Sequence, residues 1–377
     1  MELCQEHAMM RDTVREFTQK EIIPIAEKMD KEEYFPEYLF QKWADLGILG
    51  VTIPEEYGGI GSDALAQLII AEELAKGSAG IAVTYVSHAN LCVHNLYSHG
   101  SNEQRKKYLP PLCKGKNVGA LAMTEPGAGS DAVSIQTSAV RDGDAYLLNG
   151  TKMFITNAPI ANTMIVYAKT DKARPVKGVT AFIVENTFEG YRVSRKLQKM
   201  GCRSSPTGEV VLDNCRVPAE NVLGEENKGI AVMMSGLDIE RVVLAGVSLG
   251  LAQAAFADSL RYSQQREQFG QPISQFQLIQ AKLADMYTGI EAARHLAYDV
   301  AKRTPKEKRL RKESAAAALF AAEMATKVSL EAVQIHGGYG CMLEFPVNRY
   351  LRDAKICEIG GGSSEIRRLL IARELLR

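Results

Sequence analysis

The spacing of apolar side chains changes twice along the chain. In residues 1–118, apolar positions recur at helical intervals, as at Leu39, Trp43 and Leu46, which predicts an N-terminal helical domain. Residues 119–223 instead contain short runs of Val, Ile, Thr, Tyr and Phe between turns, which predict strands. From residue 224 to residue 377 the helical spacing returns, so a second helical domain is expected.

The middle segment, residues 119–223, is expected to form a small antiparallel β-barrel or sandwich. Its predicted strands follow one another with short turns and no helix between them, which argues against βαβ units. Asp142-Gly143-Asp144 and Asn149-Gly150 are both typical of hairpin turns. The strands are predicted at residues 134–141, 146–148, 153–156, 164–167, 179–184 and 210–212.

The C-terminal segment, residues 224–377, is expected to form a bundle of about four long helices. Residues 313–333 are rich in alanine, which is the strongest helix former. In the N-terminal segment, Pro110-Pro111 is expected to end a helix. The predicted fold class is therefore α+β, in the order helical domain, β domain and helical bundle.

Composition and charge exclude several classes of protein. The 377 residues include 45 Lys+Arg and 45 Asp+Glu, so the formal net charge is zero. That balance argues against nucleic-acid binding through phosphate neutralisation and against a polybasic membrane surface. No apolar run is long enough to span a bilayer, and the N-terminus begins like a helix with early acidic residues, not like a targeting segment.

Cysteine and histidine spacing favours reduced thiols and no metal site. The seven cysteines are scattered, with no CxxC pair, as expected for a cytosolic protein. His88 and His94 lie near Cys92, which leaves a metal site there as a less favoured alternative. The basic run at residues 302–312 is interpreted as a solvated loop, with a docking patch as the weaker alternative.

One carboxylate interrupts an apolar stripe in the helix that follows Gly229. Glu240 lies seven residues after Met233 and four before Leu244, so the pattern places it on the buried face. Burial should raise the pKa of this carboxyl, which suits a general base near neutral pH. The alternative is a structural glutamate paired with a buried arginine, or a stripe rotated enough to expose it.

The flanking residues are predicted to lie off this stripe. Asp238 and Arg241 point elsewhere, and their spacing of three residues allows them to pair on the helix surface.

Two glycine-rich segments offer bare backbone to a ligand. In residues 121–131, Gly127 and Gly129 permit close approach, although a plain turn explains them equally well and the pattern is not a Rossmann fingerprint. Residues 359–365 place three glycines before a helix whose N-cap is predicted to be Ser363, and such a helix end suits anionic or electron-rich ligands. An ordinary capped turn is the alternative there, and a helix C-cap explains most of residues 334–340.

Taken together, five motifs resemble the acyl-CoA dehydrogenase family over essentially the whole chain. They are LAMTEPGAGSD (121–131), FITN (154–157), REQFGQPISQFQ (266–277), QIHGGYG (334–340) and LRDAKICEIGGGSSEIRR (351–368). Most family members carry the catalytic glutamate at the position of Gly361, which cannot act as a base. The isovaleryl-CoA dehydrogenase branch places it in an SGLDxER motif, and Ser235–Arg241 is similar to that branch. The resemblance therefore selects Glu240, the residue that the buried stripe indicates.

The resemblance implies FAD-dependent α,β-dehydrogenation of an acyl-CoA to the 2-enoyl-CoA. Glu240 would take the α-proton, and the β-hydrogen would leave as hydride to flavin N5. The residues that would contact FAD, some of them in a neighbouring subunit, are Leu121, Met123, Thr124, Gly129, Ser130, Phe154, Ile155, Thr156, Arg266, Phe269, Gln277, Gln334, Gly337, Gly338, Ser363, Ser364 and Glu365. Those that would contact the substrate are Ser130, Ala231, Asp238, Arg241, Gly361 and Gly362.

Three departures from the family pattern bear on the substrate. Phe154 replaces a Trp, Ala231 replaces a Tyr of the isovaleryl branch, and Gly361 replaces its Ala. The last two changes enlarge the pocket, so we expect an acyl group bulkier than isovaleryl, either cyclic, aromatic or otherwise branched.

The resemblance also implies partners and rival activities. Electron-transferring flavoprotein would accept the electrons, and the assembly would be a homotetramer built as a dimer of dimers. A bacterial cytoplasmic protein is expected, with a mature mitochondrial matrix protein as the alternative. The rival activities are an enoyl-CoA reductase or an acyl-CoA oxidase on the same fold, or a non-catalytic scaffold.

Overall fold

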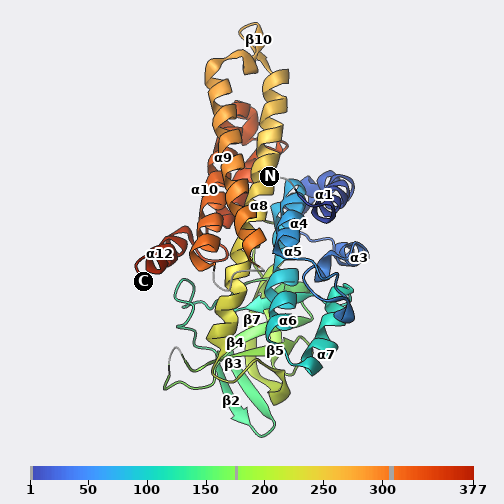
Figure 1. The fold of residues 1–377 in the computed structure, drawn as a ribbon, viewed down its shortest axis with the longest axis vertical. Helices are drawn as coiled ribbons and strands as arrows, with labels where there is room; N and C mark the ends of the chain where they lie inside the picture. Colours follow the sequence, from blue (N-terminus) through green and yellow to red (C-terminus); the bar gives the residue numbers. More distant parts are fainter. Residues whose placement is uncertain (1–2, 175–176, 305–309) are drawn as a thin grey trace.

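The computed structural model describes residues 3–174, 177–304 and 310–377. The long C-terminal helices extend from one end of the molecule, with a short two-stranded hairpin at their tip, and the strands of the middle segment lie at the other end beside N-terminal helices (Figure 1). None of the helices within the described residues combines the length and hydropathy that a membrane span needs.

The N-terminal segment is helical, as predicted. Its α-helices are α1 (Gln5–Phe17), α2 (Ala26–Glu32), α3 (Tyr38–Asp45), α4 (Ala64–Gly77), α5 (Ala79–Val86), α6 (Asn95–His99) and α7 (Asn102–Cys113). The prediction that Pro110-Pro111 ends a helix is wrong, because both prolines lie inside α7. They lie in its last turn, where the helix continues for only two more residues, and the Lys114 N–H bonds to the carbonyl of Pro110.

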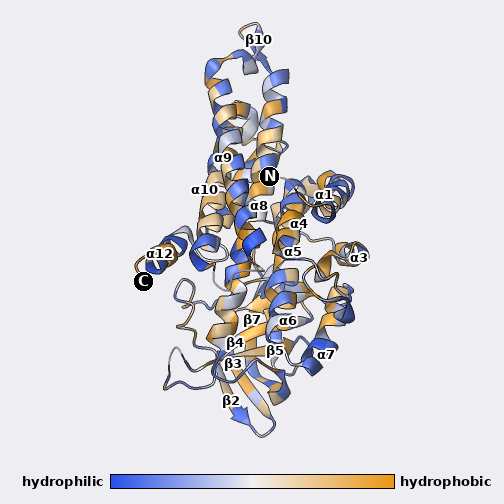
Figure 2. Cartoon of the chain, in the orientation of Figure 1, coloured by the Kyte–Doolittle hydropathy of each residue, from blue (hydrophilic) through white to orange (hydrophobic). Residues whose placement is uncertain are grey.

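The described part of the middle segment contributes eight strands to one sheet. They are β1 (Gly119–Ala122), β2 (Ser138–Asp142), β3 (Ala145–Thr156), β4 (Thr163–Lys169), β5 (Val179–Glu185), β6 (Tyr191–Lys196), β7 (Thr207–Pro218) and β8 (Val222–Leu223). The order is β6-β7-β3-β2-β4-β5-β8, with β1 beside β4. All seven residues of β4 are buried, and Figure 2 shows the apolar colour gathered in these central strands.

Two details of the strand prediction are corrected. The sheet is mixed, because β4 pairs in parallel with β1 and with β2. The other strand pairs of this sheet are antiparallel, as predicted. Asn149-Gly150 forms no hairpin: it lies within the continuous strand β3, at an irregularity where β3 pairs with β7. The absence of a side chain lets Gly150 lie against Thr137, where a Cβ would come within 2.4 Å of Oγ1. The strands β6 and β8 were not predicted.

Within the described residues of the C-terminal segment there are three long helices and two shorter ones. They are α8 (Gly229–Gln265), α9 (Gln277–Arg303), α10 (Arg311–His336), α11 (Pro346–Cys357) and α12 (Ser364–Leu375). The alanine-rich segment is helical as predicted. The centre of the basic run, residues 305–309, lies outside the described residues. A two-stranded hairpin, β9 (Glu267–Gln268) and β10 (Gln271–Pro272), joins α8 to α9.

Helix α8 packs directly on α4, so that the two helical segments share one hydrophobic cluster. A Cβ on Gly250 would lie 2.0 Å from the carbonyl oxygen of Glu72, and one on Gly246 would lie 2.4 Å from that of Leu68. Glycine at these two positions therefore permits the close approach of the helices.

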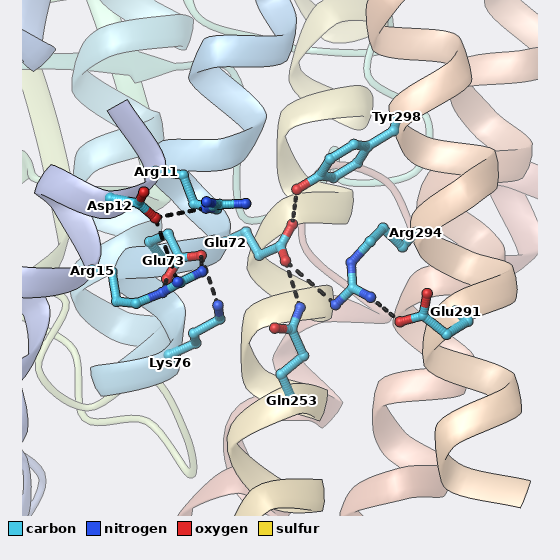
Figure 3. Close-up of polar contacts among 10 residues, drawn as sticks. All are labelled: Arg11, Asp12, Arg15, Glu72, Glu73, Lys76, Gln253, Glu291, Arg294 and Tyr298. Carbon is cyan, nitrogen blue, oxygen red and sulfur yellow. Dashed lines mark hydrogen bonds and ion pairs between the residues drawn. The ribbon is translucent and has the colours of Figure 1, made fainter. Parts of the chain in front are cut away.

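A buried polar network crosses this contact (Figure 3). Glu72 of α4 accepts hydrogen bonds from Gln253 of α8 at 2.5 Å and from the hydroxyl of Tyr298 of α9 at 2.8 Å. The next residue, Glu73, pairs with Arg15 of α1 at 3.0 Å. These bonds tie α1, α4, α8 and α9 together, and so fix the position of α8, which carries the candidate base.

Candidate active site

Glu240 lies on the buried face of α8, as the apolar stripe predicts. Only 6% of the residue is exposed. Burial raises the pKa of its carboxyl to about 7, although the positive charges of Arg241 and Arg367 act to lower it. Within the described residues, its Oε2 atom has no hydrogen-bond partner. A buried carboxylate with a free oxygen and a pKa near neutrality is equipped to accept a proton.

A glycine turn faces this carboxylate. Gly361 and Gly362 lie between α11 and α12, with φ angles of 66° and 97°, in the left-handed region that favours glycine. A Cβ on Gly361 would lie 3.5 Å from Oε1 of Glu240 and 2.5 Å from Cδ1 of Leu244. Leu244 therefore occupies part of the space that the missing side chain leaves, which limits how far Gly361 alone can enlarge a pocket.

The prediction that Arg241 lies off the buried face is wrong. Its side chain is buried, and it binds Oδ1 of Asp238 at 2.8 Å, as the spacing of the two residues predicts. Asp238 also binds Arg311 at the start of α10, at 3.1 Å. Burial raises the pKa of Asp238, and the two arginines oppose that effect. This cluster joins α8 to α10.

A buried ion pair that the sequence analysis missed supports the loop after β1. Lys152 of β3, which is 0% exposed, binds Glu125 at 2.8 Å and the carbonyl of Met123 at 3.2 Å. Burial lowers the pKa of Lys152 to about 8. The Glu125 carboxylate also accepts the backbone N–H groups of residues 136 and 137. The signal that could have revealed this pair is a lysine that directly precedes the apolar run at residues 153–155.

The same loop is joined to the FITN motif. The Met153 N–H donates to the carbonyl of Thr124 at 2.9 Å, so residues 121–131 and 154–156 lie side by side. Phe154 has a φ of 62° at a strand irregularity, and 67% of the residue is exposed. The side chain of Ile155 is buried in the sheet, so it can offer only backbone to a ligand.

The glycines of this loop face open space. Cβ atoms on Gly127 and Gly129 would meet no atom within 4 Å. Ser130 is exposed beside them, and Leu121 and Thr124 are half-buried. Protein packing therefore does not require these glycines, and an approaching ligand would find bare backbone.

The N-terminus of α12 is capped as predicted. The Ser363 hydroxyl accepts the N–H of Ile366 at 3.5 Å, and a hydrogen bond with Ser363 lowers the pKa of Glu365 in the first turn. Ser364 is buried, and its hydroxyl has no partner within the described residues. The capped N-terminus of α12 lies directly after the glycine turn that faces Glu240.

A second cluster of predicted residues lies far from Glu240 within the chain. Arg266 follows α8, 26 residues after Glu240, which is about 39 Å along the helix. Its guanidinium lies over the ring of Tyr339, 5.6 Å from the centroid, next to the glycine turn at Gly337. Phe269, at the tip of the hairpin, is 94% exposed. Contacts of these residues, and of Gln277, Gln334 and Gly338, with FAD would require a neighbouring subunit, which stays a prediction.

The structure gives no support to a place for Ala231 beside the base or to the alternative metal site near His88 and His94. Ala231 lies nine residues before Glu240, about 13 Å away along α8 and on the opposite side of the helix, so the structure does not bring the two together. At the alternative metal site, His88 accepts the N–H of Gly119 and His94 bonds to Thr52, and burial lowers the pKa values of these histidines to about 3 and about 4.

Comparison with known proteins follows the order of the three segments. Residues 4–116, 120–215 and 227–376 match family models for the N-terminal, middle and C-terminal domains of acyl-CoA dehydrogenase. The chain is 49% identical over 369 residues to mitochondrial isovaleryl-CoA dehydrogenase of Oryza sativa, covering 97% of this chain and 90% of the relative.

Solved structures give the same result. Butyryl-CoA dehydrogenase of Megasphaera elsdenii matches with a TM-score of 0.98 and 41% identity over 100% of both chains. A structure described as electron transferring flavoprotein of Acidaminococcus fermentans contains a chain with a TM-score of 0.98 and 42% identity, covering 100% of this chain and 99% of that one.

Proposed function

Since the chain belongs to the acyl-CoA dehydrogenase family, an oxidoreductase family that acts on CH–CH bonds, we propose that it oxidises a branched or otherwise bulky acyl-CoA. The product is the 2-enoyl-CoA, and Glu240 is the base. One observation carries the assignment of the base: a buried carboxylate with an unpartnered oxygen faces a turn of bare glycine backbone.

The residues present fit FAD, the cofactor of this family. A flavin ring needs a flat apolar wall, and the ring of Phe154 is held out from the sheet and exposed. Phosphate groups need backbone donors, and the N-terminus of α12 with its bare glycine turn offers them. Bound FAD would rest against residues 121–131 and 154–156, with Ser363, Ser364 and Glu365 at its polar part, and it supplies the acceptor for the hydride that leaves the β-carbon.

The protein's own contribution is removal of the α-proton in a dry site. Ionised Glu240 breaks the α C–H bond, and the new O–H bond forms on its carboxyl. Because burial brings its pKa to about 7, the carboxyl can carry the charge before the step and the proton after it near neutral pH. The bare Gly361-Gly362 backbone lets the acyl thioester approach closely, and Asp238 and Arg241 fix the adjacent part of α8.

The proposed acyl group is bulkier than isovaleryl, on the strength of Gly361. A Cβ there would overlap Cδ1 of Leu244 and would be in ordinary contact with Oε1 of Glu240, so its absence leaves beside the base the space that Leu244 does not fill. The rice relative is named for a branched acyl-CoA, which supports a branched substrate. Ala231 adds no support, because it lies too far from Glu240.

Assembly and partners follow as proposals. The exposed hairpin residues, Phe269 among them, suit a contact in a homotetramer built as a dimer of dimers. Electron-transferring flavoprotein is the proposed acceptor, supported by the structure from Acidaminococcus fermentans. A bacterial cytoplasmic location is proposed, with the mitochondrial matrix as the alternative.

A substrate panel tests this proposal. Steady-state turnover with an artificial electron acceptor should be fastest for branched, cyclic or aromatic acyl-CoAs, and isovaleryl-CoA should be slower. Activity confined to isovaleryl-CoA would contradict the larger acyl group. Oxygen consumption at the same rate without the acceptor would indicate an oxidase instead, and turnover only from the enoyl-CoA side would indicate a reductase.

A further inference from the structure

Arg367 of α12 is a buried cation that the proposed chemistry has not yet used. Only 1% of the residue is exposed. Its Nη2 atom donates to the carbonyls of Gly360 at 2.6 Å and Cys357 at 3.1 Å, and Nη1 donates to that of Ala318 at 3.3 Å. The guanidinium therefore ties together α10, the end of α11 and the first residue of the glycine turn.

Carbonyl oxygens accept hydrogen bonds from both Nη atoms of Arg367 but do not neutralise its charge, and its Nε has no partner among the described residues. A buried charge is costly unless an opposite charge lies near it. Across the described part of the chain, no carboxylate lies within ion-pair distance of Arg367. Burial lowers the pKa of Arg367, and the charge of Glu240 opposes that effect, just as the charge of Arg367 opposes the raised pKa of Glu240. Arg367 donates to Gly360, and the next residue, Gly361, lies against Glu240, so one glycine turn contacts both residues.

The other groups facing Glu240 cannot replace this charge. Arg241, on the same helix, is already paired with Asp238, which is also bound to Arg311. Tyr167 of β4 is neutral, because burial raises the pKa of its phenol. Cys357, beside Arg367, is also neutral, because burial raises the pKa of its thiol to about 11.

We propose that Arg367 is a positioning residue for the base: it holds Gly360, and with it the glycine turn, against Glu240, and it places an unpaired positive charge behind that turn. This inference rests on the proposed role of Glu240. In the C-terminal motif at residues 351–368, Arg367 would then act on the base and not through contact with a ligand.

Two substitutions separate the two effects. Arg367→Lys keeps the charge but loses the fork that binds several carbonyls at once, and Arg367→Gln keeps amide donors but loses the charge. Arg368→Gln is the matched control: Arg368 is the next residue, is largely exposed, and pairs with Glu323 at 2.7 Å. Thermal unfolding confirms that each variant is folded.

The first readout is the pH dependence of kcat/KM. Arg367→Gln should move its acidic limb upward by about one pH unit, because an opposite charge near a carboxyl is worth roughly that much. Arg367→Lys should leave the limb in place and lower kcat with little change in KM, since the turn is held less firmly. Arg368→Gln should match the unmodified protein in both respects.

The second readout does not depend on turnover. Infrared difference spectra against pH follow the carbonyl band of protonated Glu240, which Glu240→Gln identifies by its loss. The band should persist to higher pH in Arg367→Gln and should be unchanged in Arg367→Lys. If the Gln variant fails to fold, the Lys variant still provides a test. An unmoved band in Arg367→Gln, or an equal shift in the Lys variant, would overturn the proposal. Normal turnover by Glu240→Gln would instead reject the proposed function, while the infrared result would still stand.

Discussion

The Cβ position of Gly361 lies 3.5 Å from Oε1 of Glu240. By the resemblance of the motifs, Gly361 stands at the position that carries the base in most of the family, in the turn between α11 and α12. That position and Glu240 of α8 therefore approach the same point from a turn and a helix. A side chain at residue 361 would be in contact with the carboxylate, so the two positions are neighbours in the fold.

Substitution of Gly361 tests that relationship. Gly361→Ala should lower the free energy of unfolding by about 2 kcal/mol, because the new methyl group overlaps Leu244. Gly143→Ala is the control, since Gly143 also has a positive φ of 61° but no atom within 4 Å of its Cβ position. In urea unfolding, Gly361→Ala should be the more damaging change, and Leu244→Val should recover part of the loss. Equal effects at the two glycines would mean that backbone strain alone explains the result.

The pH dependence of activity follows from the pKa of Glu240. A base must be ionised, so kcat/KM should rise up to tenfold per pH unit below about pH 7 and level off above it. Measurement with a substrate whose own groups do not titrate in that range checks the limb. A limb near pH 4.5, the ordinary value of a glutamate, would show that Glu240 is solvated in the working enzyme.

The free energy of unfolding should also depend on pH because of Glu240. The pKa of Glu240 is higher in the folded chain than in the unfolded one, so the folded state binds more protons between about pH 4.5 and pH 7. This contribution to stability is complete at low pH and is lost as the pH rises through 7. Glu240→Gln should therefore gain about 2 to 3 kcal/mol relative to the unmodified protein between pH 5 and pH 8. A constant difference between the two proteins would contradict the burial of the charge.

The buried pair of Lys152 and Glu125 predicts a defect in the loop after β1. Lys152→Met leaves the Glu125 carboxylate buried without its cation, which should cost about 3 to 5 kcal/mol of stability. Flavin retention on a desalting column should fall as well, because Lys152 also holds the carbonyl of Met123. Adding Glu125→Gln should recover part of the stability. No loss in Lys152→Met would show that the loop is held by its backbone bonds alone.

The order of the elements and the buried position of Glu240 could be predicted because both depend on local periodicity. The apolar stripe of α8 placed the carboxylate correctly, and the alanine-rich run predicted α10. The capping of α12 by Ser363 was also readable, since it involves residues three apart. Each of these features is determined by neighbours in the sequence.

The rest depends on contacts between distant segments. Asn149-Gly150 has the composition of a hairpin, but pairing with β7 absorbs it into one long strand. Arg241 is buried because α10 supplies Arg311 to its partner Asp238, and Arg367 is buried because three carbonyls from separate elements converge on it. No spacing within a helix reveals such partners.

Anaerobic bleaching of the flavin band by acyl-CoA tests the central claim most directly. The FAD-loaded protein is mixed with a branched or cyclic acyl-CoA at pH 8, where Glu240 is ionised, and the same mixture is made with Glu240→Gln. The account predicts rapid loss of the band in the unmodified protein and a rate at least about a hundredfold lower in the variant, which still binds flavin and substrate. Equal bleaching by the two proteins would show that another group removes the proton, and would contradict the account.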